Sequence, residues 1–224
     1  MERFELHCHT NHSKCAAHTP EQVLKAAKAR GLTGIAITDH NTIRGARAAE
    51  KLNQDKDFTV IVGEEVKTEI GEVLVYFVQT EIRPGRFQDV IKEARRQKAL
   101  CVLAHPYNRL SDLTNRLLPI SGRRSLRDES VLEHLDAIEI TNGRCFADEN
   151  RSAAALASRH HMPGVCGSDA HFPDEIGRLI VEFEGGFREA ILSGRFNCIG
   201  RPRLPFLNRM RSMWPTLLFK LRKH

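Results

Sequence analysis

The sequence predicts an α/β protein whose strands form a closed or nearly closed barrel. Short apolar runs of strand length alternate with segments of helical periodicity along the 224 residues. Seven or so such strands, each followed by a helical or loop segment, suit a barrel better than an open sheet. Potential metal ligands follow most of the strands, which is where the functional sites of such barrels lie.

The amino-terminal half supplies four strands and three helices. Thr19 and Gln22 can form a capping box with Pro20 at the first helical position, so a helix is expected to begin there and to end at Gly31. Further helices are expected over 43–52 and after Phe87, where apolar side chains recur at helical spacing. Strands are expected in the short apolar runs 3–6, 34–38, 59–62 and 73–78.

The carboxy-terminal half continues the alternation. An alanine-rich helix is expected over 147–160 and a short helix after Gly186, whereas 106–128 reads as an irregular segment with many arginines. Strands are expected at 99–104, 135–141, 164–168 and 178–183. We find no internal repeat and no low-complexity segment.

Composition indicates one globular domain followed by a basic tail. The chain is 41% hydrophobic and 28% charged, which suits a buried core under a charged surface. Residues 201–224 hold seven Lys and Arg and no acid, whereas residues 1–200 hold 27 bases and 28 acids. The net charge of +6 therefore belongs to the tail. We expect one domain over 1–200 and a basic amphipathic tail over 201–224.

The compartment is expected to be the cytoplasm. No stretch reaches the roughly 18 uninterrupted apolar residues of a transmembrane segment. The amino terminus lacks the basic and then apolar pattern of a secretory signal. Six cysteines are scattered without CxxC pairs, which suits reduced thiols better than a disulfide framework.

Potential metal ligands gather at the ends of the predicted strands. The segment LHCHTNHS, residues 6–13, holds three histidines within six positions. If the strands are parallel neighbours, the groups that end them converge on one rim of the barrel. After the later strands the sequence places Asp39, His40, Glu64, Glu65, His105, Asn142, Arg144, Asp169 and His171, with Glu139 inside a strand.

The spacing of two pairs favours a metal site over a pH-sensitive patch or chance. Residues two apart on a strand point to the same face, so His7 and His9 aim together, as do Asp169 and His171. Imidazoles joined by carboxylates from neighbouring strands form a chelate for zinc, manganese or iron. Each motif alone could be a turn, a helix cap or a solvated loop. Burying them all together without a cation would be costly, so their repetition predicts a metal site.

Six motifs resemble those of a known family. HCHTNHS, ITDHNT, VGEE, AHP, IEITNGR and GSDAH, in this order, are similar to the PHP (polymerase and histidinol phosphatase) family over residues 4–185. The resemblance implies a distorted (β/α)7 TIM-like barrel with two or three divalent metal ions at the carboxyl ends of its strands. It also implies that the domain over 1–200 is a metal-dependent phosphoesterase.

The resemblance also assigns ligands to positions. It implies a first ion on His7, His9, Glu65 and Asp169, a second on Glu65 and His105, and a third on His40 and His171.

Two departures from the family pattern concern the second and third ions. Cys15 stands where members often place an aspartate for the third ion. A thiolate could ligate and favour a softer ion such as zinc, the third site could be weak or empty, or His12 could substitute. Some members supply the second ion with a histidine on the strand after the glutamate. The run 73–78 contains none, and Glu72 is a poor candidate.

The implied reaction is attack of a metal-bridging hydroxide on phosphorus. Glu65 would bridge the ions, and Asp169 or His171 would protonate the leaving group. Arg144 and Arg178, with Asn142, are the expected substrate-binding residues, because a guanidinium grips phosphate bidentately. For either arginine the alternative is an ordinary salt bridge.

The expected substrate is a phosphorylated small molecule or a nucleotide, with a short nucleic acid as a further possibility. The arginine-rich segment 106–128 could cap the site and guide an anionic substrate. In the tail, apolar side chains at helical spacing predict a helix packed on the barrel, with a nucleic-acid arm or a lipid-surface segment as alternatives. These residues are Phe206, Met210, Met213 and Leu217.

Two other functional readings stay open. A degenerate PHP module with a structural or regulatory role is favoured only by Cys15. An amidohydrolase-like barrel also begins with an HxH motif, but it usually has a metal-bridging lysine after a middle strand, where this chain has Glu65. The sequence does not indicate an oligomeric state.

Overall fold

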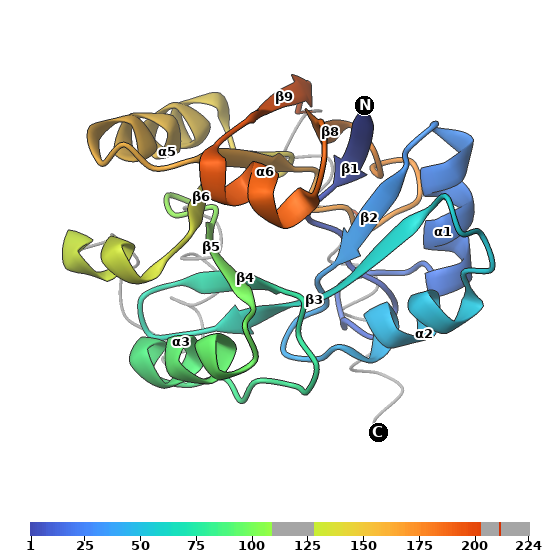
Figure 1. Ribbon diagram of the computed structural model, residues 1–224, viewed down its shortest axis with the longest axis horizontal. Helices are drawn as coiled ribbons and strands as arrows, with labels where there is room; N and C mark the ends of the chain where they lie inside the picture. The colour runs from blue at the N-terminus through green and yellow to red at the C-terminus, as the bar shows by residue number, and fades with distance from the viewer. Residues whose placement is uncertain (109–127, 203–210, 212–224) are drawn as a thin grey trace.

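The computed structural model describes residues 1–108, 128–202 and 211. In this part of the chain, nine strands form one sheet in the order β7-β6-β5-β4-β3-β2-β1-β8-β9, which curls into a nearly closed barrel (Figure 1). The strands are β1 (Glu2–Glu5), β2 (Gly34–Ile37), β3 (Thr59–Lys67), β4 (Glu72–Tyr76), β5 (Leu100–Ala104), β6 (Ala137–Asn142), β7 (Gly164–Gly167), β8 (Leu179–Phe183) and β9 (Phe196–Gly200). The predicted α/β barrel class is confirmed.

The barrel closes just beyond the ends of β1 and β7. Cys8 and Ala170 form a parallel bridge there. The His9 N–H donates to the Ala170 carbonyl at 2.9 Å, and the Ala170 N–H donates to the His7 carbonyl at 3.1 Å. The seam of the barrel therefore lies between the HxH and DxH motifs and brings them together.

Helices cover the outside of the barrel (Figure 1). The predicted capping box at Thr19 and Gln22 is present at the start of the first helix. Just after that helix Gly31 has a φ of +68°, a conformation that glycine adopts without strain. The described helices are α1 (Pro20–Ala29), α2 (Arg44–Leu52), α3 (Phe87–Arg96), α5 (Ala147–Arg159) and α6 (Phe187–Ser193), with a 3-10 helix η1 (Glu129–His134).

Alternation along the strands sorts their side chains into two apolar layers. On β3, Val60 and Val62 pack beneath the helices, whereas Ile61 belongs to a second cluster that fills the barrel. The interior cluster also contains Leu74 of β4 and Val102 of β5. Glu65 has the same parity as Ile61, so the interior layer ends in a carboxylate at one mouth of the barrel.

The condition that the strands are parallel neighbours does not hold throughout the sheet, because β4, β8 and β9 run antiparallel to their neighbours. β4 is antiparallel to both β3 and β5, and β8 is antiparallel to both β1 and β9. Only residues 68–71 separate β3 from β4, which is too short for a crossover helix, so the two strands form a hairpin. The Thr68 N–H closes it on the Gly71 carbonyl at 2.8 Å. β9 was not predicted, because nearly all of its residues are exposed and it lacks an apolar run.

Two predicted segments lie largely outside the described residues. These are the arginine-rich stretch 106–128, described only to residue 108 and at residue 128, and the tail 201–224, of which residues 201, 202 and 211 are described. Among the described residues, no helix combines the length and the apolar character needed to cross a membrane.

Candidate metal centre

The first predicted ligand group comes together at the seam of the barrel. His7 Nε2 lies 3.2 Å from His9 Nε2, and His9 Nε2 lies 3.1 Å from Asp169 Oδ1. One donor atom from each of the three residues falls within 4.8 Å of the others, and all three side chains are buried. These residues can therefore enclose one divalent ion between β1 and β7.

Glu65 lies at the middle of the centre. Its Oε1 is 2.9 Å from His105 Nε2 and 3.6 Å from His7 Nε2. Its Oε2 is 2.8 Å from His40 Nδ1 and 3.6 Å from His9 Nε2. Each carboxylate oxygen thus faces a different pair of imidazoles, an arrangement suited to a bridging ligand.

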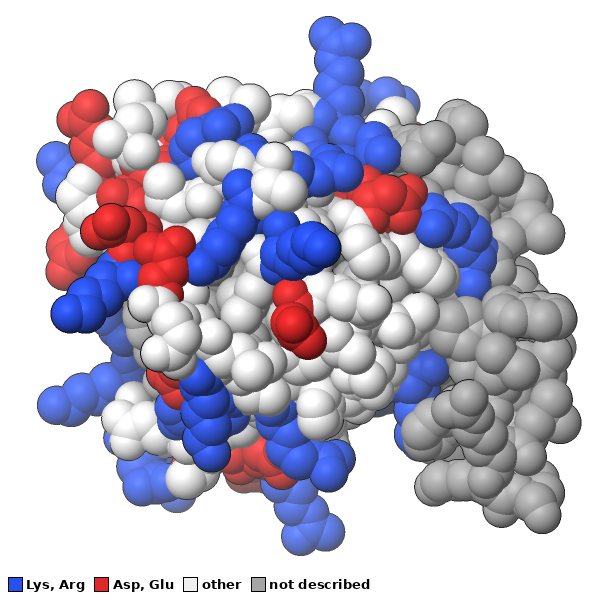
Figure 2. All heavy atoms as spheres, turned by 90° about the vertical axis from the view of Figure 1, so that its right-hand side faces the viewer, with Lys and Arg blue, Asp and Glu red and all other residues white. Residues whose placement is uncertain are grey.

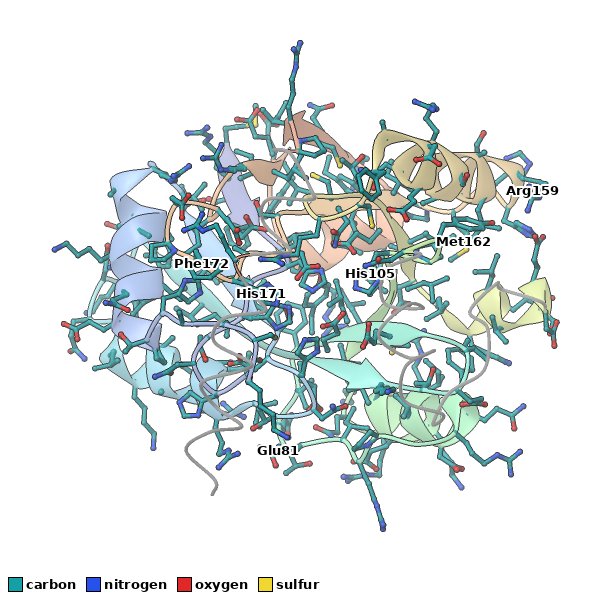
Figure 3. All side chains as sticks on the ribbon, turned by 180° about the vertical axis from the view of Figure 1, so that it is seen from behind. Glu81, His105, Arg159, Met162, His171 and Phe172 are labelled. Carbon is teal, nitrogen blue, oxygen red and sulfur yellow. The ribbon has the colours of Figure 1, made fainter. Side chains whose placement is uncertain are left out.

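Cys15 lies at one end of the centre. Its Sγ is 3.1 Å from His171 Nε2. His9, His40 and His171 each place a donor atom within 4.8 Å of the others. Figure 3 shows His171 and His105 in the middle of the molecule, whereas Glu81 and Arg159 lie toward its edges.

Glu72, which the sequence offers only as a poor ligand candidate, also lies beside the centre. Its Oε2 is 3.8 Å from His105 Nε2, and it offers an oxygen within 4.8 Å of donor atoms of His40 and Glu65. The direction of β4 is the reason. Because β4 is antiparallel, its first residue pairs with Ala104, next to His105, at the mouth where the parallel strands end.

Hydrogen bonds from neighbouring residues orient the imidazoles. His7 Nδ1 lies 2.9 Å from Glu139 Oε1, and Glu139 Oε2 accepts from the His105 N–H at 3.0 Å. His171 Nδ1 lies 2.9 Å from the Asp169 carbonyl oxygen. Such contacts hold the remaining ring nitrogen toward an ion. The sequence placed Glu139 among the groups expected to converge on the rim but assigned it no role.

The three expected substrate-binding residues have internal partners. Arg144 is buried, its Nε donates to the Asp169 carbonyl at 2.8 Å, and its Nη2 lies 3.1 Å from Glu175. Asn142 is also buried and donates to Glu139 and Asp169. Arg178 Nε donates to the carbonyl of Asp174. Their part in substrate binding stays a prediction.

Glu5 binds the main chain of the segments that carry the ligands, a role that was not predicted from the sequence. Its Oε1 accepts from the main-chain N–H groups of His7 at 3.2 Å and of Ser168 at 2.8 Å. Its Oε2 accepts from the Gly177 N–H at 3.0 Å. Burial outweighs these hydrogen bonds and raises the pKa of Glu5 to about 7. One carboxylate thus joins the segments that carry His7 and Asp169.

The buried imidazoles and carboxylates stabilise each other's charged forms. Burial opposes a charged His7, but the carboxylates of Glu139, Asp169 and Glu65 outweigh it and raise the pKa of His7 well above its usual value. Burial also opposes a charged His105, but its hydrogen bond to Glu65 outweighs burial and raises the pKa of His105 to about 9. Burial alone would raise the pKa of Glu65 and of Asp169, but the imidazoles hold both well below their usual range.

The residues fit a cation. Glu65 Oε2 is buried and lacks a hydrogen-bond partner among the described residues, although His40 and His9 nitrogens surround it. His105 and Asp169 have positive φ values of 26° and 52°, which non-glycine residues rarely adopt. Three features thus indicate a metal-binding centre: the unsatisfied carboxylate oxygen, the imidazoles that face it, and the strained backbone at two ligand positions.

Comparisons with known proteins agree with this geometry. The sequence matches the PHP domain family over residues 5–171. It is 31% identical over 151 residues to an uncharacterised protein of Methanocaldococcus jannaschii, a match that covers 62% of this chain and 81% of that protein. It is 27% identical over 218 residues to a protein of Caldicellulosiruptor saccharolyticus named probable phosphatase, covering 80% of this chain and 87% of that protein.

A solved structure shares the fold. It is a two-domain protein of Bacteroides vulgatus described as containing a PHP-like metal-dependent phosphoesterase, with a TM-score of 0.72 and 17% identity. The match covers 89% of this chain and 65% of that chain. The family match covers well over half of the sequence, and this chain belongs to the PHP domain family. It is a hydrolase of the metal-dependent phosphoesterase type.

Proposed function

We propose that the protein hydrolyses a phosphate ester of a small metabolite or nucleotide, using two or three divalent ions such as zinc, manganese or iron. The observation that carries the proposal is the position of Glu65, whose two oxygens each face a different pair of imidazoles. When bound, the ions supply Lewis acidity and activate a water for attack on phosphorus, the metal-bridging hydroxide of the expected mechanism.

The side chains of the centre have two proposed roles, metal binding and proton transfer. The proposed ligands are His7, His9, Cys15, His40, Glu65, His105, Asp169 and His171, together with Glu72. Burial and the charge of Arg144 hold the pKa of His171 well below its usual value, so this imidazole is neutral and able to ligate. We retain proton transfer to the leaving group by Asp169 or His171 as a second role.

The buried arginine acts on the site through its partners. Arg144 Nε binds the Asp169 carbonyl, and Glu175, to which Arg144 pairs, accepts from the His171 N–H at 2.7 Å. This chain of contacts holds both ends of the DxH motif. We therefore propose that Arg144 positions these ligands, and that any direct contact with phosphate is additional to this role.

A small substrate is favoured over a nucleic acid by the charge of the surface. Basic and acidic side chains are intermixed on the face that carries α1 and α2 (Figure 2). Residues 1–200 are close to neutral, whereas protein surfaces that bind nucleic acids are strongly basic. We place the enzyme in the cytoplasm. An amidohydrolase-like reaction is less favoured, because the middle strand supplies Glu65 where such barrels usually have a metal-bridging lysine.

A panel of phosphate esters tests the proposal. Metal-reconstituted protein is assayed for phosphate release from mononucleotides, 3′,5′-bisphosphate nucleotides, sugar phosphates and short RNA. We expect release from small esters, and a loss of at least about 100-fold in His7→Ala and in Asp169→Asn. His134→Ala, at an exposed histidine, is the matched control. Unchanged turnover in both ligand variants would overturn the proposal, and turnover of RNA alone would overturn the small-substrate assignment.

A further inference from the structure

The seam of the barrel continues along β7, outside the proposed ligand set. β7 ends the sheet order of the described residues, and β6 is the strand that pairs with it along its length. The Pro163 carbonyl, just before β7, accepts from the Ile138 N–H of β6 at 2.9 Å. Because successive carbonyls along a strand point to opposite sides, the Gly164 carbonyl faces the other edge, toward the seam.

Two thiols cross this seam in opposite directions. Cys198 of β9 donates its thiol hydrogen to the Gly164 carbonyl, with the sulfur 3.5 Å from the oxygen. Cys166 of β7 donates to the Ile180 carbonyl of β8 at 3.1 Å. β8 and β9 are paired neighbours, with Val181 opposite Cys198. Both sulfurs therefore lie between β7 and the β8–β9 pair.

The strand register places the two sulfurs on the same face. Residues directly opposite each other in antiparallel strands project to one side, so Cys198 shares a face with Val181. Val181 and Cys166 both belong to the apolar cluster that fills the barrel. The two thiols thus project into the same space. In agreement, a hydrogen bond with Cys198, together with burial, raises the pKa of Cys166 well above its usual value.

The two thiols differ in their access to a reagent. Cys198 is exposed, whereas Cys166 is buried. A thiol must meet its reagent as the thiolate, which favours the exposed sulfur as the first to react. Cys166 is then held beside it as the thiol that reacts second.

We propose that Cys166 and Cys198 form a reversible disulfide across the seam, with a small disulfide such as oxidised glutathione as the oxidant. The Cys198 thiolate attacks one sulfur of the oxidant, which forms a mixed disulfide and expels one glutathione thiolate. The Cys166 sulfur then attacks Cys198 Sγ, and its proton passes to the second glutathione thiolate as that group leaves. Two electrons thus pass from the two thiols to the oxidant, which leaves as two molecules of reduced glutathione.

The disulfide would make the seam covalent. The described seam is otherwise closed by the bridge between Cys8 and Ala170, and β7 leads directly into the segment that carries Asp169. The pair stays reduced in excess thiol and closes as the share of oxidised glutathione rises. The inference is independent of the proposed reaction, because neither thiol is a proposed ligand.

Peptide mapping tests the disulfide. The full chain as wild type, Cys198→Ser and Cys101→Ala is equilibrated with set ratios of oxidised to reduced glutathione, remaining thiols are alkylated, and linked peptides are identified by mass spectrometry. Cys101, a buried thiol on β5, provides the matched control. We expect a link between Cys166 and Cys198 in the wild type and in Cys101→Ala, and its loss on addition of excess dithiothreitol. Cys198→Ser should hold no link to Cys166.

Other products of the same experiment would overturn the proposal. These are a wild type that carries glutathione on Cys198 without the internal link, and one in which Cys198 is linked to a different cysteine.

Urea unfolding tests the effect of the link on the seam. The linked wild type should have an unfolding equilibrium constant roughly 30-fold or more below that of the reduced wild type. Cys198→Ser should unfold at the same urea concentration in oxidising and in reducing buffer. A linked wild type that unfolds at the same urea concentration as the reduced protein would overturn the assignment of the pair as a lock on the seam.

Discussion

Removal of the Glu5 carboxylate should destabilise the protein and loosen its ligand loops together. Glu5 is fully buried on β1, and its two oxygens accept three main-chain N–H groups, from His7, Ser168 and Gly177. Glu5→Ala leaves all three donors without this acceptor. Glu5→Gln keeps the volume but replaces one accepting oxygen by an amide group that can only donate.

The hydrogen bonds set the expected magnitude. A buried donor left unsatisfied costs about 1–3 kcal/mol, so three donors give about 3–9 kcal/mol for Glu5→Ala. A typical domain is stable by only about 5–15 kcal/mol, and the loss is therefore a large share of the total. Glu5→Gln should cost about 1–3 kcal/mol, because one oxygen and its bonds can be retained.

Urea unfolding and metal titration together measure the effect. We expect the order wild type, Glu5→Gln, Glu5→Ala in the free energy of unfolding, with metal affinity falling in the same order. Glu184→Ala, an exposed carboxylate just after β8, is the matched control and should change neither. A Glu5→Ala protein that loses less than about 1 kcal/mol would refute the assignment of Glu5 as the acceptor that joins these loops.

Two further predictions follow from the site. In Gly167→Ala the new Cβ would lie 2.4 Å from His7 Cβ and 2.9 Å from Glu139 Oε1, so we expect weaker metal binding by calorimetry; wild-type affinity in this variant would contradict the packing. Metal binding should also release protons. Burial opposes the charged forms of His7 and His105, but nearby carboxylates raise the pKa of His7 well above its usual value and the pKa of His105 to about 9. Protons therefore compete below these pKa values, and affinity should rise as pH increases toward about 9; binding heats that do not vary with the ionisation enthalpy of the buffer would contradict this.

Motif spacing was sufficient to predict most of the centre. His7, His9, His40, Glu65 and Asp169 follow or end short apolar runs, and their convergence required only that neighbouring strands end at one mouth. Alternation also explains why Glu65 rather than Glu64 enters the site. Glu64 points the other way, and its Oε1 accepts from the Ile82 N–H at 2.7 Å.

Strand direction could not be predicted from local pattern. An apolar run looks the same in a parallel and in an antiparallel strand, so the position of Glu72 at the mouth depended on the hairpin between β3 and β4. The supporting carboxylates were hidden for another reason. Glu5 and Glu139 lie inside strands, and only the folded barrel shows which N–H groups and imidazoles they meet.

The central claim is that side chains from separate strands share cations around Glu65. An anomalous-scattering map of metal-reconstituted crystals tests it most directly. We predict at least two peaks, one at coordinating distance from each oxygen of the Glu65 carboxylate, with donor-to-metal distances of about 2.0–2.3 Å. A map with no peak beside Glu65, or with peaks only at surface side chains, would contradict the account.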